Sequence, residues 1–230
     1  MSQESISYRQ EWKIPINHFD SVILRSRLQQ VMQPDRHASH GDGIYFIRSL
    51  YFDTPEDTAL REKLDGVNRR EKYRIRYYDY DVSKITLEKK FKHHGVGTKF
   101  HAPLSVGQTQ QLVDGDIAWM SQSPYSLIQE LYYQILTKQL RPTTIVDYTR
   151  EAYVYQPGNI RVTLDYNLRT GLSCTKFLDQ QVPTIAPPDE PMVMEVKWDH
   201  YLPDVIRAVI YLPGHHVTAF SKYAACRLYD

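Results

Sequence analysis

Residues 72–77 read Lys-Tyr-Arg-Ile-Arg-Tyr, and this alternation of basic and hydrophobic side chains predicts a β-strand. Successive side chains of a strand point to opposite faces of its sheet. The basic residues at the even positions would therefore share one face, while the tyrosines and the isoleucine would pack on a core. Three cations on one face repel one another unless water or a polyanion lies between them. The stretch therefore favours a surface or tunnel that holds phosphate chains.

The rest of the chain extends this pattern to a sheet-rich domain. The predicted strands span residues 8–15, 44–52, 69–80, 84–92, 98–103, 143–155, 159–168 and 192–198. The predicted helices span residues 17–32, 55–64, 105–112 and 124–140. Many long strands with helices between them predict an α+β fold around an antiparallel barrel. Because no internal repeat or linker is visible, we expect residues 1–230 to form a single domain.

Composition excludes several classes of protein. Hydrophobic residues make up 42% of the 230 positions, which is enough for a core. A net charge of +1 gives no overall attraction to nucleic acid or membranes, so any anion site must arise from local segregation of charge. No apolar run approaches the roughly 20 residues of a membrane span, and no secretory signal is visible. Two distant cysteines without metal-ligand spacing complete the expectation of a cytoplasmic protein.

The charged strand faces have two possible explanations. In an open sheet they would be solvated by bulk water. In a closed barrel they would line an interior, where each ion costs several kcal/mol unless it is paired. Phosphate oxygens, water or a metal ion would offset that cost, and arginine matches phosphate with a bidentate fork.

Four acids lie on the same faces as the cations: Glu11, Glu88, Asp165 and Glu195. They would be repelled by a bound phosphate chain unless they form ion pairs or carry a divalent cation. Mg²⁺ and Mn²⁺ are often bound by one or two carboxylates together with phosphate oxygens. Either role is open for each acid.

Three other motifs carry less weight. Residues 93–99 lack the spacing of a phosphate-binding loop and fit a hairpin turn better. The adjacent histidines at 93–94 and 215–216 do not share a face and so do not suggest zinc. The aromatic residues lie opposite the cations, which favours core packing over stacking on single-stranded nucleic acid.

Several segments in a fixed order resemble a known family. They include Glu-Trp-Lys at 11–13, Tyr-Arg-Ile-Arg-Tyr-Tyr at 73–78, Leu-Glu-Lys-Lys at 87–90, Tyr-Thr-Arg at 148–150, Arg-Val-Thr-Leu-Asp at 161–165, Met-Glu-Val-Lys at 194–197 and Phe-Ser-Lys-Tyr at 220–223. Together they are similar to the VTC domain, the polyphosphate polymerase module of the CYTH-like triphosphate tunnel metalloenzyme superfamily. The resemblance covers nearly the whole chain.

This resemblance implies a closed antiparallel eight-stranded β-barrel, with helices packed outside and a C-terminal helix at one end. The residues it implies for phosphoryl transfer are Lys13, Arg74, Arg76, Lys90, Arg150 and Arg161. Further phosphate contacts would come from Lys72, Lys99, Tyr148, Lys197, Ser221 and Lys222. Glu195 would be the first ligand of Mn²⁺ or Mg²⁺, with Glu11, Glu88 and Asp165 as further candidates. The expected activity moves the γ-phosphate of ATP onto a polyphosphate chain.

The chain also departs from the superfamily pattern. Hydrolytic members begin with Glu-x-Glu-x-Lys, whereas this chain has Arg9 in place of the first acid, which argues against a hydrolase. Ala219 stands where the polymerase would supply a lysine. A tripolyphosphate or nucleoside triphosphate hydrolase and a non-catalytic polyphosphate-binding module therefore remain the alternatives.

Overall fold

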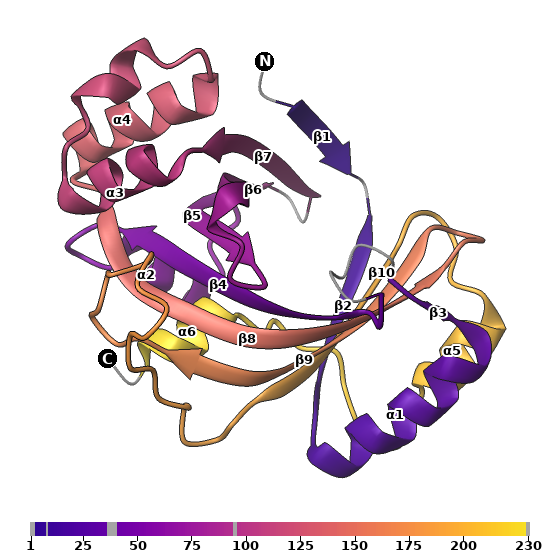
Figure 1. Ribbon diagram of the computed structural model, residues 1–230. Coiled ribbons are helices and arrows are strands. Elements are labelled where there is room, and N and C mark those ends of the chain that lie inside the picture. The colour runs from indigo at the N-terminus through magenta and orange to yellow at the C-terminus, as the bar shows by residue number, and fades with distance from the viewer. Residues whose placement is uncertain (1–2, 8, 36–40, 94–95, 229–230) are drawn as a thin grey trace.

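The computed structural model describes residues 3–7, 9–35, 41–93 and 96–228, and it shows an antiparallel sheet that curls strongly on itself (Figure 1). The hydrogen-bonded order is β1 (Gln3–Ser7), β7 (Val96–Leu104), β6 (Ile85–His93), β5 (Arg70–Tyr78), β4 (Ile44–Asp53), β8 (Arg141–Tyr155), β9 (Ile160–Thr170), β10 (Met192–Trp198) and β2 (Gln10–Ile16). The short β3 (Gln33–Pro34) pairs with β8 off this path.

The helices are α1 (His18–Val31), α2 (Thr58–Leu64), α3 (Val106–Asp114), α4 (Ser126–Lys138), α5 (Asp204–Ile210) and α6 (Lys222–Arg227), with 3-10 turns η1 (Val82–Lys84) and η2 (Ala118–Gln122). On the convex face of the sheet they form two groups, α1 with α5 and α3 with α4 (Figure 1). The first core lies between α3, η2, α4 and strands β4 to β8. The second lies between α1, α5 and strands β2, β8, β9 and β10. Among the described residues, none of the helices has the length and apolar composition needed to cross a bilayer.

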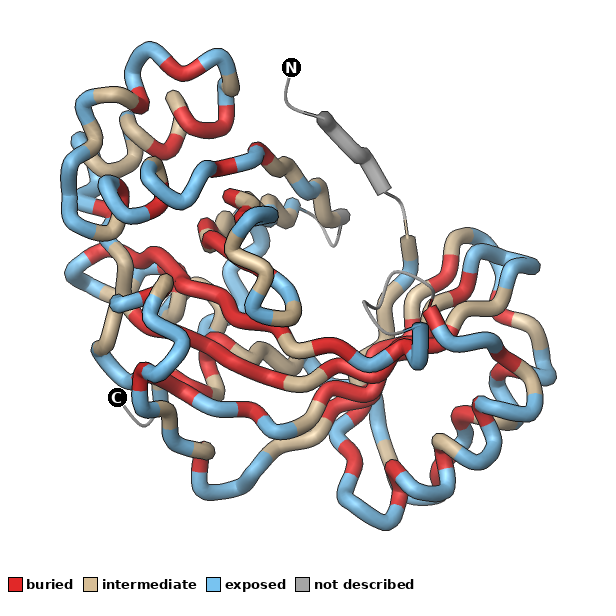
Figure 2. Tube along the Cα trace, viewed as in Figure 1, coloured by how far each residue is buried: buried red, intermediate tan, exposed pale blue. Residues whose placement is uncertain are grey.

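The alternation predicted for residues 72–77 is confirmed in β5. Tyr73, Ile75 and Tyr77 are at most 2% exposed and belong to the core beneath α3 and α4. The intervening basic residues therefore lie on the opposite, concave side of the sheet. Figure 2 shows how continuously the central strands are buried.

The C-terminal helix packs against the concave side, unlike the helices of the two convex groups. The ring of Tyr223 in α6 stacks on Tyr51 of β4, with 4.8 Å between the ring centroids. Its hydroxyl donates a hydrogen bond of 2.6 Å to Asp53. Asp53 also accepts the amide hydrogen of Ala59 at 2.8 Å and thereby caps α2. One buried carboxylate thus joins β4, α2 and α6.

The expectation of a closed eight-stranded barrel needs correction. The sheet has ten strands and is curled, and in the described part of the chain no ladder joins β2 to β1 or β7. The reason is that β1 and β2 follow each other along the chain, so that β1 takes the place beside β7 while β2 pairs with β10. The helix expected over 55–64 also begins later, at Thr58, because Asp57 has a left-handed φ of 55°.

Candidate functional site

Strands β5, β6 and β7 place one charged cluster on the concave side of the sheet, which we call the lumen. Arg74 lies opposite Glu88 in the β5–β6 ladder, and its Nε donates to Glu88 Oε2 at 2.7 Å. Lys99 donates to Glu88 Oε1 at 2.6 Å, and Arg76 lies 3.8 Å from Oε2. Burial alone would raise the pKa of Glu88, but these cations hold it well below its usual range. Glu88 is therefore an anion that orders Arg74, Arg76 and Lys99, which together form the Arg74 cluster.

Strands β8, β9 and β10 hold a second cluster together with α6. Arg150 forms a bidentate pair with Asp165, with distances of 2.6 and 2.7 Å. Lys222 Nζ lies 2.5 Å from Asp165 and 3.2 Å from Glu195, and Arg150 lies 3.4 Å from Glu195. Burial would raise the pKa of both acids, but the neighbouring cations lower it, and the pKa of Glu195 falls well below its usual range. We call these four residues the Asp165 cluster.

A third group shows that the curl brings distant strands together. Glu11 of β2 pairs with Lys197 of β10 at 3.4 Å and with Lys90 of β6 at 3.7 Å. Lys13 lies 3.4 Å from Glu195 and so joins this group to the Asp165 cluster. Because β6 and β2 lie near opposite ends of the strand order, the pair between Lys90 and Glu11 spans the lumen.

Tyr148 of β8 contacts side chains of both clusters. Its hydroxyl accepts a hydrogen bond of 3.2 Å from Arg76. Its ring lies 4.8 Å from the ammonium of Lys222 and 5.5 Å from the guanidinium carbon of Arg150. These contacts place a neutral aromatic surface beneath three cations.

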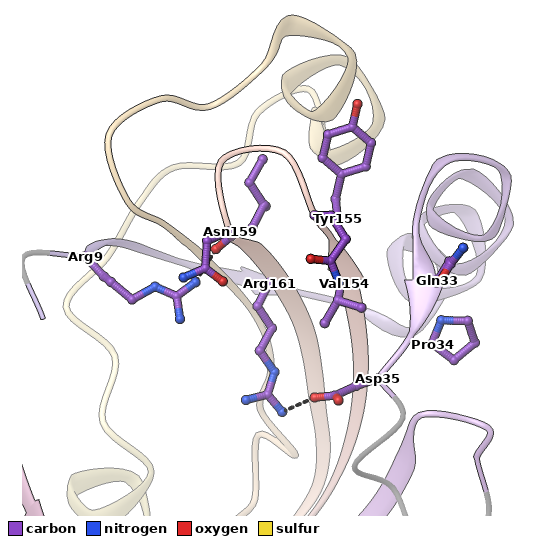
Figure 3. Close-up of a pocket in the computed structure, with 10 residues that line it drawn as sticks. Arg9, Gln33, Pro34, Asp35, Val154, Tyr155, Asn159 and Arg161 are labelled. Atoms are coloured by element: carbon purple, nitrogen blue, oxygen red, sulfur yellow. Dashed lines mark hydrogen bonds and ion pairs between the residues drawn. The ribbon is translucent and has the colours of Figure 1, made fainter. Parts of the chain in front are cut away.

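Arg161 lies at an edge of the lumen and belongs to neither cluster. Its NH2 atom forms an ion pair of 2.8 Å with Asp35 and donates to the hydroxyl of Tyr45 at 2.5 Å. This pair borders a hollow of about 410 Å³ between β3, the end of β8 and the start of β9 (Figure 3). Arg9 lines the same hollow and forms an ion pair with Asp199.

Lys72 and Ser221 meet at the start of α6. Ser221 caps this helix by accepting the amide hydrogen of Ala224. Lys72 Nζ donates to Ser221 Oγ at 3.3 Å and lies 5.2 Å from the centre of the Tyr223 ring. Burial, followed by repulsion from nearby cations, lowers the pKa of Lys72 to about 7.

The structure brings together most of the residues that the sequence singled out. Those linked by hydrogen bonds, ion pairs or ring contacts around the lumen are Glu11, Lys13, Lys72, Arg74, Arg76, Glu88, Lys90, Lys99, Tyr148, Arg150, Asp165, Glu195, Lys197, Ser221 and Lys222. Arg161 stands apart at the edge. Basic side chains outnumber acidic ones in this set, so the lumen as a whole attracts anions.

The four acids do not form one metal site. Glu88 lies with the Arg74 cluster, whereas Glu11, Asp165 and Glu195 are linked through shared lysine and arginine partners. Within the described residues, no three His, Cys, Asp or Glu side chains are grouped so as to hold a metal ion. The hydroxyl of Thr163, directly across the β9–β10 ladder from Glu195, is buried and has no hydrogen-bond partner in the described structure. The side-chain oxygen atoms of Thr163 and Glu195 therefore suit a divalent cation whose remaining ligands are phosphate oxygens and water.

Sequence reasoning missed several side chains in the lumen and at its end near α2. Tyr51 accepts a hydrogen bond of 2.8 Å from Arg74, and Thr163 supplies the buried hydroxyl. Arg70 and Lys92 face each other in the β5–β6 ladder. The signal for both was present, because they continue the even-numbered basic positions of the two strands. Lys63 gave no such signal, and only the fold places its ammonium 2.5 Å from the carbonyl oxygen of residue 219.

Comparison with known proteins identifies the family and the fold. The family model for the VTC domain matches residues 8–229. A putative adenylyl cyclase from Hippeastrum, described as having a dominant triphosphatase activity, is 15% identical with a TM-score of 0.57, over 96% of this chain and 95% of that one. A putative adenylate cyclase from Bacillus halodurans is 13% identical with a TM-score of 0.50, over 90% and 86% of the two chains. At these identities the likeness concerns the fold alone. No curated protein matches the sequence.

Proposed function

The chain belongs to the VTC domain family, and from that premise we propose that it is a polyphosphate polymerase-like phosphotransferase. Its substrates would be ATP and a polyphosphate or triphosphate chain held in the lumen. The observation that carries the proposal is the excess of cations in the lumen, which the curl of the sheet gathers from strands near both ends of the strand order. The ion pair between Lys90 of β6 and Glu11 of β2 shows that these ends meet across the lumen. We place the protein in the cytoplasm as part of the same proposal, with no nucleic acid partner.

The lumen residues would act by binding and positioning. Arg74, Arg76 and Arg150 offer guanidinium forks that match phosphate oxygens, and Lys222 offers a point charge. The buried acids hold these cations in place before substrate arrives, so little reorganisation is needed when charge develops. This suits phosphoryl transfer, in which positioning and electrostatic stabilisation carry most of the rate.

In the transfer itself, a terminal oxygen of the polyphosphate chain forms a bond to the γ-phosphorus of ATP. The bond between that phosphorus and the β,γ-bridging oxygen breaks, and ADP leaves with the electron pair. Glu195 and Asp165 are the residues that would hold a divalent cation, with Thr163 beside them. Such a cation, when bound, would neutralise negative charge on the phosphates.

A hydrolase of the same fold is the alternative, and the lowered pKa values of the lumen acids argue against it. A hydrolase that activates water by general-base catalysis needs a carboxylate with a pKa near the working pH. The neighbouring cations instead lower the pKa of Glu88, Asp165 and Glu195 and so make them weak bases. At the position of the missing first acid, Arg9 is paired with Asp199 and supplies no carboxylate.

One assay distinguishes the possible functions. The purified protein is incubated with ATP and Mn²⁺, and the products are separated by chain length. Polyphosphate chains together with ADP support the polymerase. Orthophosphate as the main product would support the hydrolase, and unchanged ATP with tight binding of tripolyphosphate would support a non-catalytic binding module.

A further inference from the structure

Cations of like charge face each other at one end of the β5–β6 ladder. Arg70 lies directly opposite Lys92, and Lys72 lies directly opposite Lys90. Like charges in directly opposite positions destabilise an antiparallel pair. Farther along the same ladder, Arg74 lies opposite Glu88, which is the arrangement expected of a stable sheet. The facing cations at the Arg70 end therefore destabilise this part of the ladder.

Lys90 is paired with Glu11, but three other cations near this end, Lys63, Arg70 and Lys72, donate to neutral oxygen atoms. Lys63 of α2 donates to the carbonyl of Ala219 at 2.5 Å, and Arg70 donates to the carbonyl of Val67 at 2.6 Å. Lys72 donates to the hydroxyl of Ser221. In the described part of the chain, neither these three residues nor Lys92 forms an ion pair with a carboxylate. We call Lys63, Arg70, Lys72 and Lys92 the rim.

Burial and repulsion from neighbouring cations both lower the pKa values of lysines in the rim. Burial lowers the pKa of Lys63, and the charges of Arg70, Lys13 and Lys92 lower it further. Burial and the charges of Lys63, Arg70 and Lys13 lower the pKa of Lys72 to about 7. A bound polyanion would reverse both effects, because it would stabilise the charged forms.

The rim lies directly beside the two clusters of the lumen. Lys72 is two residues from Arg74 on the same face of β5, and it contacts Ser221, the neighbour of Lys222 in the Asp165 cluster. At about 3.3 Å per residue, Arg70 lies roughly 13 Å along the strand from Arg74. A longer chain bound at Arg74 would therefore cover the Arg70 end of the strand more fully than a triphosphate would.

We propose that the rim is a subsite for the phosphates of a polyphosphate chain that extends beyond those held in the lumen. A long chain would pass Ser221 and leave along β5 and β6 toward α2. The proposal rests on the proposed function, because it requires the lumen to hold phosphate. It adds a preference for long chains over triphosphate and assigns the side on which the chain emerges.

The test compares two inorganic ligands, tripolyphosphate and long-chain polyphosphate, by calorimetric titration at constant ionic strength. The variant combines Lys63→Gln, Arg70→Gln and Lys92→Gln. Since hydrogen bonds to charged groups contribute about 1.5–3 kcal/mol, we expect its affinity for the long chain to fall at least about tenfold. Its affinity for tripolyphosphate should stay within about twofold, because the charges that bind it are retained.

A control variant removes positive charge outside the lumen. Lys84→Gln combined with Lys138→Gln removes two exposed lysines that pair with Asp81 and Glu71, and it should leave both affinities unchanged. Thermal unfolding reports on the fold, and the rim variant should be at least as stable as the unaltered protein because repulsion is relieved.

Equal losses for both ligands, or no loss for either, would overturn the rim as a subsite. A long chain that binds the unaltered protein no more tightly than tripolyphosphate would overturn it as well. Failure of the proposed transferase activity alone has a different signature, in which the unaltered protein binds both ligands but forms no polyphosphate from ATP. A further possible result is that the unaltered protein binds neither ligand. That result would remove both proposals.

Discussion

The Asp165 cluster and the rim use the same basic residue types but differ in how their charge is balanced. In the Asp165 cluster, Arg150 and Lys222 share two buried carboxylates at distances of 2.5–3.4 Å. In the rim, Lys63 and Arg70 bond to backbone carbonyls, and the pKa of Lys72 falls to about 7. Paired cations keep their positions without a ligand, whereas unpaired cations gain most when a polyanion arrives. The first arrangement favours precise positioning, and the second favours capture of a long chain.

The largest effect is expected where a buried pair is broken. Asp165→Ala would leave Arg150 and Lys222 buried with less compensation, and removal of one partner of a buried pair costs about 3–5 kcal/mol. We expect the free energy of unfolding, measured in urea, to fall by about this amount. Lys84→Ala, which removes the exposed partner of Asp81, should change that free energy by less than about 1 kcal/mol. Similar stabilities for the two variants would contradict the difference between buried and exposed pairs.

The next effect concerns catalysis within the Asp165 cluster. Glu195→Gln keeps the size of the side chain but removes its charge, so we expect turnover of ATP with Mn²⁺ to fall by at least about 100-fold. Binding of tripolyphosphate without metal should persist, because the lumen becomes more positive. Product formation and titration measure the two properties separately. Normal turnover of this variant at ordinary metal concentrations would remove Glu195 from the metal site.

The Arg74 cluster provides a smaller effect on binding. Arg74→Ala removes one guanidinium fork, and we expect polyphosphate binding to weaken by about 1.5–3 kcal/mol, the range for charged hydrogen bonds. Titration of the variant beside Lys84→Ala, which alters an exposed lysine, separates a local contact from a general loss of charge. An affinity equal to that of the unaltered protein would exclude Arg74 from the site.

The smallest expected effect is a change in the protonation of Lys72, which distinguishes the rim from the Asp165 cluster. The pKa of Lys72 is about 7 in the folded protein and 10.5 for an ordinary lysine, so between these values the folded state binds fewer protons than the unfolded chain. Stability should therefore gain from Lys72 as pH rises through this window. A bound polyanion raises the pKa again, and polyphosphate binding at about pH 8.5 should take up as much as about one proton.

Calorimetry in two buffers with different ionisation enthalpies measures this uptake. Lys72→Gln should reduce it. Equal uptake by the variant and the unaltered protein would assign the proton to another group and contradict an unpaired Lys72.

Much of the fold could be read from the sequence because strand alternation is local. The side-chain direction in residues 72–77 follows from the backbone geometry of one strand, and the structure confirms that Tyr73, Ile75 and Tyr77 enter the core. The same reasoning placed Glu195 and Lys197 on one face of β10. The prediction of a closed barrel was wrong. Closure depends on which strands pair at the two edges of the sheet, and β1 occupies the place beside β7.

The sequence by itself determined the kinds of charge on each strand face and the family to which the chain belongs. Only the tertiary structure decided that Glu88 pairs with all three cations of the Arg74 cluster, that Arg161 pairs with Asp35 at the edge, and that the rim has no carboxylate partner in the described residues. These pairings join residues that are far apart in the chain, such as Asp165 and Lys222. The physical reason is that side-chain direction depends on neighbouring backbone, whereas the balance of charge depends on how the whole sheet curls.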